Sequence, residues 1–363
     1  MKSKKLYWLF ALIILIYNCK PETVMPCKSD TNSHNPTPYV WNLPWNIAPP
    51  APSMKNPMTV EGIELGRHLF YEEMLSRTNT ISCSSCHDQS CAFTDCGKVL
   101  SIGVDGLTGT RNSMSLVNLA WSSSFNWDGS SPSLPLHHLG PVTNPVEMDE
   151  TWESVVAKLS ADSIYPKMFL DAFGTKIITK EQTTMAIAQF VKTIVSYHSK
   201  FDSNLYAGLR LSNEESDGLL LFTLEPSKGG ADCAQHCHTT AKSFHDNDFH
   251  DNGLDPHCVT GFVDNGRGGH TGVAEHMGQF RTPTLRNIAL TGPYMHDGRF
   301  SKLEDVVGFY SQGVINKPCL DPALKDHIPF NLNSKKQADL LAFLHTFTDH
   351  SLLNNPDYSD PNP

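Results

Sequence analysis

Hydrophobic positions recur along much of this chain with the period of an α-helix. Between residues 180 and 195 apolar side chains return every three or four positions, and Thr179 with Gln182 forms a capping box ahead of them. A second capping box, Ser212 with Glu215, precedes the apolar run GLLLF. We predict a helix after each box.

Two further helices are predicted in the C-terminal third. Ser301 with Glu304 opens the segment LEDVVGFY, and Ser334 with Gln337 opens the last helix. The apolar face of that last helix consists of Leu340, Leu341, Leu344 and Phe347. No stretch alternates with period two over a useful length, and the segments between helices are long and rich in glycine and histidine. We therefore expect an all-α fold whose long loops are held by cofactors.

The N-terminus predicts export. Three lysines precede an apolar stretch from Leu6 to Tyr17, which is too short to cross a bilayer comfortably and is typical of a signal peptide. Residues 1–19 are predicted to form this signal. Cys19 follows the stretch directly, as in bacterial lipoproteins, although Asn18 is not the small residue usual before a lipidated cysteine. A periplasmic lipoprotein and an ordinarily cleaved exported protein both remain open.

The next segment, residues 20–56, is rich in proline and predicts a tether or extended arm. Trp41 and Trp45 within it are candidates for docking on the domain behind. At 363 residues the chain is long enough for two domains. Its formal charge of −10 leaves no basic surface for a phosphate backbone, so nucleic acid is not expected as a partner.

The motif CSSCH predicts a covalently bound haem. In a Cys-x-x-Cys-His sequence two thiols bond the porphyrin edge and the histidine binds the iron, leaving the opposite face for another ligand or a substrate. Cys83, Cys86 and His87 have this spacing. Zinc is the alternative, but Cys91 and Cys96 do not form the second pair that a zinc finger needs.

A second motif, CAQHCH at 233–238, has one residue too many for this spacing. The extra residue must bulge, and His236 adds a competing imidazole, so from these residues alone a metal or disulfide role is as open as a haem. The two motifs, each followed by loops and then helices, predict two similar modules, 57–205 and 206–350, with residues 351–363 as a tail.

Ten cysteines in an exported chain favour an oxidising compartment. One or two disulfides are plausible among the cysteines outside the two motifs, and Cys91 and Cys96 are the nearest pair. The cysteines concerned are Cys19, Cys27, Cys91, Cys96, Cys258 and Cys319. Spacing does not assign the pairs.

Several long segments, in order along the chain, resemble the bacterial di-haem cytochrome c peroxidase family, including its relative MauG. They are LGRHLFYEEMLS, ISCSSCHDQSCAFTDCGK, SIGVDGLTGTRN, FNWDG, LGPVTNPVEM and FRTPTLRNIALTGPYMHDGRFSKLEDVVGFY. The resemblance covers roughly residues 57 to 348. It implies two all-α cytochrome c-like domains, each with one covalent c-type haem.

The same resemblance favours a haem at the second motif. LLLF and FHDNGL bracket CAQHCH as they bracket the family's second haem motif, which implies Cys233, Cys237 and His238 as its anchors. The extra residue is a departure from the family pattern.

The resemblance also implies a calcium ion between the domains. Its ligands would include Asn112 in TRN and the backbone oxygens of Thr291 and Pro293 in TGP. An oxygen-only set suits calcium, although a simple turn is the alternative.

Axial ligands distinguish members of the family. Peroxidases that need reductive activation have a histidine where this chain has Val104, which cannot bind iron, so the first haem is expected to be open without prior reduction. At the second haem, Tyr310 matches a ligand position that is tyrosine in MauG and methionine in the activated peroxidases. Met295 is the rival ligand, and a core tyrosine is the alternative reading of Tyr310.

Three residues match catalytic positions of the family. Glu147 corresponds to a distal glutamate, and a carboxylate over an open iron can move the proton between the two peroxide oxygens. His137 replaces a distal glutamine and would either hydrogen-bond peroxide or bind the iron and close the site. It and His138 are otherwise a solvated pair, and His138 is expected to face elsewhere. Trp127 matches the tryptophan between the haems and would conduct electrons, core filling being the alternative.

The expected function is reduction of hydrogen peroxide at the first haem, with oxidising equivalents shared with or supplied by the second. The electron donor would be a small redox protein. Alternatively, a MauG-like enzyme would oxidise residues of a partner protein, and the third hypothesis is a non-catalytic carrier or sensor. Sequence leaves the oligomeric state open, a homodimer included.

Overall fold

The computed structural model describes residues 34–239 and 243–361. The expectations for the signal peptide and for Cys19 and Cys27 lie outside these residues. Asn35–Pro363 form one compact unit. Its α-helices are α1 (Val60–Tyr71), α2 (Leu134–His137), α3 (Leu139–Thr143), α4 (Trp152–Ala161), α5 (Tyr165–Phe173), α6 (Lys180–Thr193), α7 (Lys200–Ala207), α8 (Asn213–Thr223), α9 (Gly266–Thr271), α10 (Leu303–Gly308), α11 (Pro322–Lys325) and α12 (Ser334–His345).

Short helical turns and one minimal sheet complete the described secondary structure. The 3-10 turns are η1 (Glu73–Leu75), η2 (Cys83–Ser85), η3 (Gln89–Cys91), η4 (Val104–Gly106), η5 (Leu119–Trp121), η6 (Pro226–Lys228) and η7 (Ala274–His276), and η8 (Phe309–Gly313) is a π-helix. Strands β1 (Phe249–His250) and β2 (Phe280–Arg281) pair antiparallel. The structure is thus mostly helical, with little sheet. Among the described helices, none combines the length and apolar character needed to cross a bilayer.

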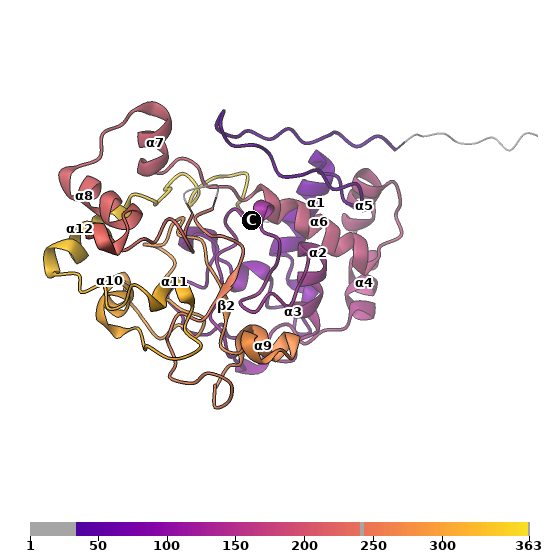
Figure 1. Cartoon of the computed structure of the whole chain (residues 1–363). Coiled ribbons are helices and arrows are strands. Elements are labelled where there is room, and N and C mark those ends of the chain that lie inside the picture. Colours follow the sequence, from indigo (N-terminus) through magenta and orange to yellow (C-terminus); the bar gives the residue numbers. More distant parts are fainter. Residues whose placement is uncertain (1–33, 240–242, 362–363) are drawn as a thin grey trace, which may run out of the picture. The chain divides into compact units, whose positions relative to one another are not determined.

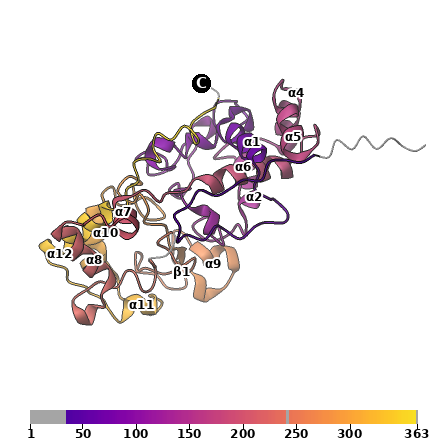
Figure 2. The same cartoon turned by 90° about the horizontal axis from the view of Figure 1, so that it is seen from above.

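Two hydrophobic cores organise the helices. The first is built around α1, α5 and α6, and the second around α8, α10 and α12; these two groups of helices lie on opposite sides in both views (Figure 1 and Figure 2). In each core a glycine permits close helix contact. A Cβ on Gly66 of α1 or on Gly218 of α8 would overlap the backbone oxygen of Ala186 or Asp339, respectively. Helices α1 and α6, and α8 and α12, therefore pack backbone to backbone.

Two of the four predicted helix starts are confirmed. The Thr179 side chain accepts from Gln182 N at 3.2 Å at the start of α6, and Ser212 with Glu215 forms a complete capping box on α8. The patterns at the other two starts were misassigned.

Helix α10 begins at Leu303, and Ser301 does not cap it. Lys302 stands in the N-cap position with extended backbone and no side-chain cap bond, and the buried Leu303 starts the helix. Helix α12 does begin at Ser334, but its cap is Asn333, which accepts from Lys336 N at 3.0 Å. Asparagine and serine are about equally good caps, so the pattern could not choose between adjacent positions.

The chain passes from the first core to the second between Ile194 and Phe201. The boundary predicted near residue 205 falls inside α7. Residues predicted to form a tail return to the first core, where Leu352 and Tyr358 are buried and the Tyr358 hydroxyl donates to Thr193 O at 2.7 Å.

The described part of the proline-rich arm contacts the first module. Thr37 hydroxyl donates to the Glu61 carboxylate at 2.8 Å, and the ring of Trp41 lies 6.0 Å from that of Trp121, centroid to centroid. Trp45 is 88% exposed. One of the two tryptophans expected to dock therefore does so.

Candidate functional site

The first Cys/His motif lies on the turn η2 and the residues after it. His87 N donates to Cys83 O at 3.1 Å, which folds the motif so that its two cysteines and its histidine belong to one turn. Burial raises the pKa of Cys83 to about 12, with smaller contributions from Cys86 and Glu147. The thiol is therefore neutral at pH 7 and suited to an apolar contact.

The second motif keeps the same turn despite its extra residue. His238 N donates to Cys233 O at 2.9 Å, one residue further along than the corresponding bond in the first motif. Burial raises the pKa of Cys233 to about 12, as it does for the first cysteine of CSSCH. The insertion is thus accommodated by a wider turn between the cysteines, and the histidine keeps its place relative to the first thiol.

Both motif histidines are oriented by the same backbone contact. His87 Nδ1 lies 3.0 Å from Phe93 O, and His238 Nδ1 lies 2.9 Å from Phe244 O. Both phenylalanines are buried and have positive φ, 60° and 53° respectively, which turns the carbonyl toward the ring. Because Nδ1 donates to a carbonyl, Nε2 carries the lone pair and is free to bind a metal, as in other metal-binding histidines.

The cysteines divide by role. In the part of the chain that the structure describes, Cys83, Cys86, Cys233 and Cys237 are free thiols. The disulfides are Cys91–Cys96 and Cys258–Cys319. The nearest pair predicted from sequence is therefore bonded, and the motif cysteines remain available for thioethers.

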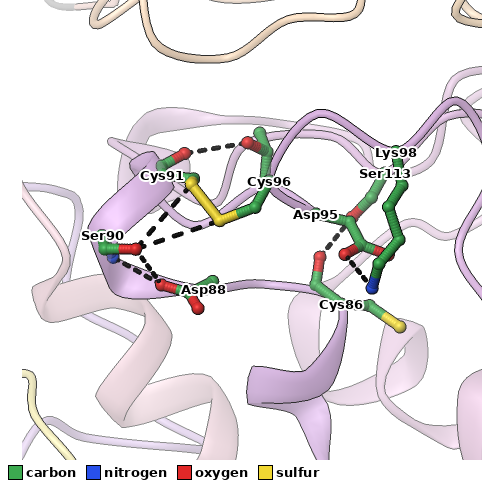
Figure 3. The surroundings of a disulfide bond; sticks show 9 residues. Cys86, Asp88, Ser90, Cys91, Asp95, Cys96, Lys98 and Ser113 are labelled. Atoms are coloured by element: carbon green, nitrogen blue, oxygen red, sulfur yellow. Dashed lines mark hydrogen bonds and ion pairs between the residues drawn. A yellow bond between two sulfur atoms is a disulfide. The ribbon is translucent and has the colours of Figure 1, made fainter.

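The Cys91–Cys96 disulfide closes the loop that follows the first motif (Figure 3). On one side of it, Ser90 donates to the Asp88 carboxylate at 2.6 Å. On the other side, the Ser113 hydroxyl donates to Cys86 O at 2.8 Å and also lies 3.3 Å from His87 Nδ1. The loop contacts the motif histidine through Phe93 O, and Ser113 contacts both the second cysteine and the histidine from another segment.

Glu147 lies near the first motif, close enough for its charge to affect both cysteine thiols. Asn144 Nδ2 donates to Glu147 Oε1 at 2.6 Å. Burial raises the pKa of Glu147, and the bond from Asn144 opposes this rise. The carboxyl group is therefore partly buried, fixed at one oxygen and poised for proton transfer.

Val104 packs against the backbone of this glutamate. It is buried, and Val104 N donates to Glu147 O at 2.8 Å. The adjacent Gly103 has no room for a side chain, since a Cβ there would overlap the carbonyl oxygen of Val146. The loop that carries Val104 is thus seated on the Glu147 segment, with an apolar side chain at this position.

His137 and His138 are not a solvated pair, so that interpretation was wrong. The Nδ1 atoms of both rings are buried and have no hydrogen-bond partner among the described residues. Burial, assisted by the charges of His87 and Arg281, lowers the pKa of His137 to about 4. Burial also lowers the pKa of His138. Both imidazoles are neutral at pH 7.

The second motif lines a large cavity that also contains Tyr310 and Met295. Tyr310 belongs to the π-helix η8, a helix type often found at functional sites. Met295 has a positive φ of 72°. Asn252 Nδ2 lies 3.3 Å from the Tyr310 hydroxyl and 3.8 Å from Met295 Sδ. Both candidate ligands therefore lie beside the same side-chain amide.

Burial raises the pKa of Tyr310 to about 12, Asn252 opposes this rise, and Cys237 and Cys233 add to it. The phenol therefore belongs to the same site as the motif thiols. A buried phenolate needs a nearby positive charge, which a metal ion would supply.

Trp127 connects the surroundings of the two motifs. Its indole Nε1 donates to Asn112 O at 2.9 Å, and the next residue, Ser113, contacts His87. Trp127 also lines the cavity of the second motif, and Arg281 N donates to Trp127 O at 2.7 Å. The indole is therefore fixed by hydrogen bonds at a position shared by both sites.

Asn112, Thr291 and Pro293 all line this cavity. Asn112 Nδ2 donates to the backbone oxygens of Lys98 and Val99, at 3.1 and 3.0 Å. The three residues predicted around calcium thus line one cavity, and a calcium ion there stays a prediction.

Sequence reasoning missed Arg281, which lines the same cavity and is buried. Its Nε has no hydrogen-bond partner in the described chain, and burial lowers its pKa to about 10. A buried guanidinium without a carboxylate fits the propionate groups that a haem carries on its edge. In the sequence Arg281 is only one of the polar residues of the segment FRTPTLRN. Nothing in that segment indicates that its Nε is buried without a partner.

His250 was missed as well. It lies between Asp321 and Asp246, with Nδ1 2.6 Å and Nε2 2.7 Å from their carboxylates. Although burial lowers the pKa of His250, these two partners raise it to about 12. This charged triad adjoins Cys237 and fixes the FHDNGL segment beside the second motif.

Comparison with known proteins agrees with this arrangement. The profile of the di-haem cytochrome c peroxidase family matches residues 60–208. The chain is 36% identical to the methylamine utilization protein MauG of Methylorubrum extorquens, over 80% of this chain and 79% of that protein. It is 31% identical to the cytochrome c551 peroxidase of Nitrosomonas europaea, over 84% of each.

Among solved structures, a MauG-like protein associated with microbial copper homeostasis superposes with a TM-score of 0.82 at 34% identity, covering 89% of this chain and 99% of that one. With the paired motifs, these similarities establish that the chain belongs to the di-haem cytochrome c peroxidase and MauG family. A di-haem family implies two c-type haems. The free motif thiols, the histidine Nε2 atoms and the buried Arg281, whose Nε has no hydrogen-bond partner among the described residues, fit them.

Proposed function

We propose that this protein is an exported di-haem peroxidase that reduces hydrogen peroxide at the first haem and uses the second haem for electron transfer. The observation that carries the proposal is the buried carboxyl group of Glu147 near the thiols of the first motif, with the buried Val104 packed against its backbone. Peroxide reduction needs an open iron and a nearby base. Curated relatives named as cytochrome c peroxidases support the reaction type.

When bound, the first haem supplies the iron at which the oxygen–oxygen bond is cleaved. Glu147 moves the proton: Asn144 occupies Oε1, and Oε2 takes the proton from the near oxygen of peroxide and returns it to the leaving oxygen. The burial that raises the pKa of this carboxyl group brings it closer to the working pH, so both transfers become easier.

His137 orients the peroxide in this proposal. Because its pKa is lowered to about 4, it is a neutral imidazole at pH 7, able both to donate and to accept a hydrogen bond. Its buried Nδ1 has no partner among the described residues and would gain one from the substrate.

At the second haem we propose Tyr310 as the ligand opposite His238, with Met295 as the alternative. Asn252 donates toward the Tyr310 hydroxyl and so stabilises its deprotonated form. Trp127 conducts electrons between the two haems, and Asn112, Thr291 and Pro293 hold a calcium ion beside it.

A second candidate function is oxidation of residues in a partner protein. Val104 and Tyr310 favour it, since these positions match MauG rather than the reductively activated peroxidases. Both curated and solved relatives that are named MauG or MauG-like support it. A small redox protein would be the partner of the peroxidase, and a protein substrate that of the MauG-like enzyme.

Mixing the oxidised holoprotein with stoichiometric peroxide tests these proposals. A rapid change in haem absorption supports catalysis. If the original absorption returns within one turnover when a reduced small redox protein is added, the peroxidase function is supported. A change that persists without donor favours the MauG-like role. An unchanged spectrum would leave a carrier or sensor. Spin resonance of the oxidised protein, in which open first-site iron is high-spin, gives an independent check.

A further inference from the structure

The residues flanking the thiols of the second motif form a cluster at the edge of the cavity that this motif lines. Asp232 precedes Cys233, and His236 precedes Cys237. His236 Nε2 lies 3.1 Å from Asp232 Oδ2, and His327 Nε2 lies 4.0 Å from the same oxygen. The three potential ligand atoms all lie within 4.8 Å of one another.

A hydrogen bond between Asp232 and His236 does not account for this cluster. The side chain of Asp232 is only 5% exposed, and its second oxygen, Oδ1, is buried without a hydrogen-bond partner among the described residues. An unsatisfied buried carboxylate oxygen is costly. His327, from the segment after α11, brings a second imidazole to the same carboxylate.

We propose that Asp232, His236 and His327 bind one divalent transition-metal ion beside the second haem motif. Two imidazoles and one carboxylate are typical ligands of Zn²⁺, and Cu²⁺ binds such sets more tightly still. In tetrahedral zinc sites the ligand atoms are about 3.3 Å apart, since the bonds are ~2.0–2.1 Å long. The separations of 3.1 and 4.0 Å need only small side-chain movements to reach this geometry.

The exposure of the cluster fits a site reached from solvent. The side chain of His236 is 45% exposed and that of His327 is 28% exposed, whereas Asp232 forms the buried floor. The metal would keep water in its remaining position.

The test uses the untagged holoprotein, treated with chelator and then dialysed against buffered Zn²⁺. Metal content is read by mass spectrometry, with protein sulfur as the internal measure of protein, so that zinc and iron per chain are both obtained independently. We expect one Zn²⁺ per chain, displaced by Cu²⁺. His327→Gln and His236→Gln should each weaken Zn²⁺ binding by at least about tenfold. His270→Gln, which removes an exposed histidine outside the cluster, should bind as the wild type does.

His327 is distant in sequence from the haem motif, so its variant separates metal binding from haem attachment, and unchanged iron per chain verifies this. Absence of stoichiometric Zn²⁺ in the wild type at micromolar free metal would overturn the proposal. Equal affinity of the wild type and both glutamine variants would overturn it too. Neither readout depends on peroxide turnover.

Discussion

The two Cys/His motifs hold the same anchor in different surroundings. In each, the backbone N–H of the histidine donates to the carbonyl of the first cysteine. The ring Nδ1 contacts the carbonyl of a phenylalanine six residues further along the chain. Around the first motif lie a carboxyl group and an imidazole, Glu147 and His137, whereas a phenol and a thioether, Tyr310 and Met295, line the cavity of the second. The same local scaffold thus carries two different surroundings, and the side chains around each motif make the difference.

Removing the base of the first site should have the largest effect. We expect Glu147→Gln to lower the rate of peroxide reduction by roughly 10² to 10⁴, because glutamine cannot take up the proton. Stopped-flow absorption measures the rate. Glu153→Gln, on the exposed face of α4, is the matched control. A rate near that of the wild type would assign proton transfer to another group, His137 first.

At the second site, Tyr310→Phe should change the low-spin resonance signal and raise the reduction potential, because axial-ligand identity tunes haem potentials over about 0.8 V. Met295→Leu is the matched variant and should leave the signal unchanged. Spin resonance measures the low-spin signal of both variants, and redox titration measures their reduction potentials. The opposite pattern would make Met295 the ligand.

The pH dependence of catalysis should respond to Asn144. Glu147 acts as a base only when deprotonated, so activity is lost as pH falls through its pKa, which burial has already raised. The bond from Asn144 lowers that pKa. In Asn144→Ala the pKa therefore rises, and the acid limb of kcat/KM against pH should move to higher pH. A limb that does not move would show that another group titrates there.

The smallest effect is expected from shortening the second motif to the length of the first. Deleting His236 gives CAQCH, and since His238 is anchored by Cys233 and Phe244, both haems should stay attached. Intact mass measures this directly. Loss of one haem would mean that the wider turn is needed for attachment.

Local signals predicted the helices better than their boundaries. The apolar repeats located α6, α8, α10 and α12, because burial imposes a period of 3.6 on any helix that covers a core. Capping was less certain. Ser301 matches the pattern and caps nothing, because an extended Lys302 separates it from Leu303, the buried residue that begins the helix.

The anchors of the site were readable because their chemistry requires close spacing in sequence. Cys83, Cys86 and His87 belong to one turn. Arg281 was not readable, since what distinguishes it is burial with no partner for its Nε among the described residues. The same holds for His250, whose partners include a carboxylate 71 residues away. The remaining catalytic assignments come from the family resemblance and await the experiments above.

The return of Tyr358 to Thr193 has a consequence for biogenesis. The first core includes side chains from residues 352 and 358, so it cannot close until the chain has been synthesised past residue 358. The second core needs nothing beyond Phe347. During synthesis the second core can therefore form before the first, which stays open until its C-terminal residues arrive. Truncation after residue 350 should destabilise the first core and spare the second.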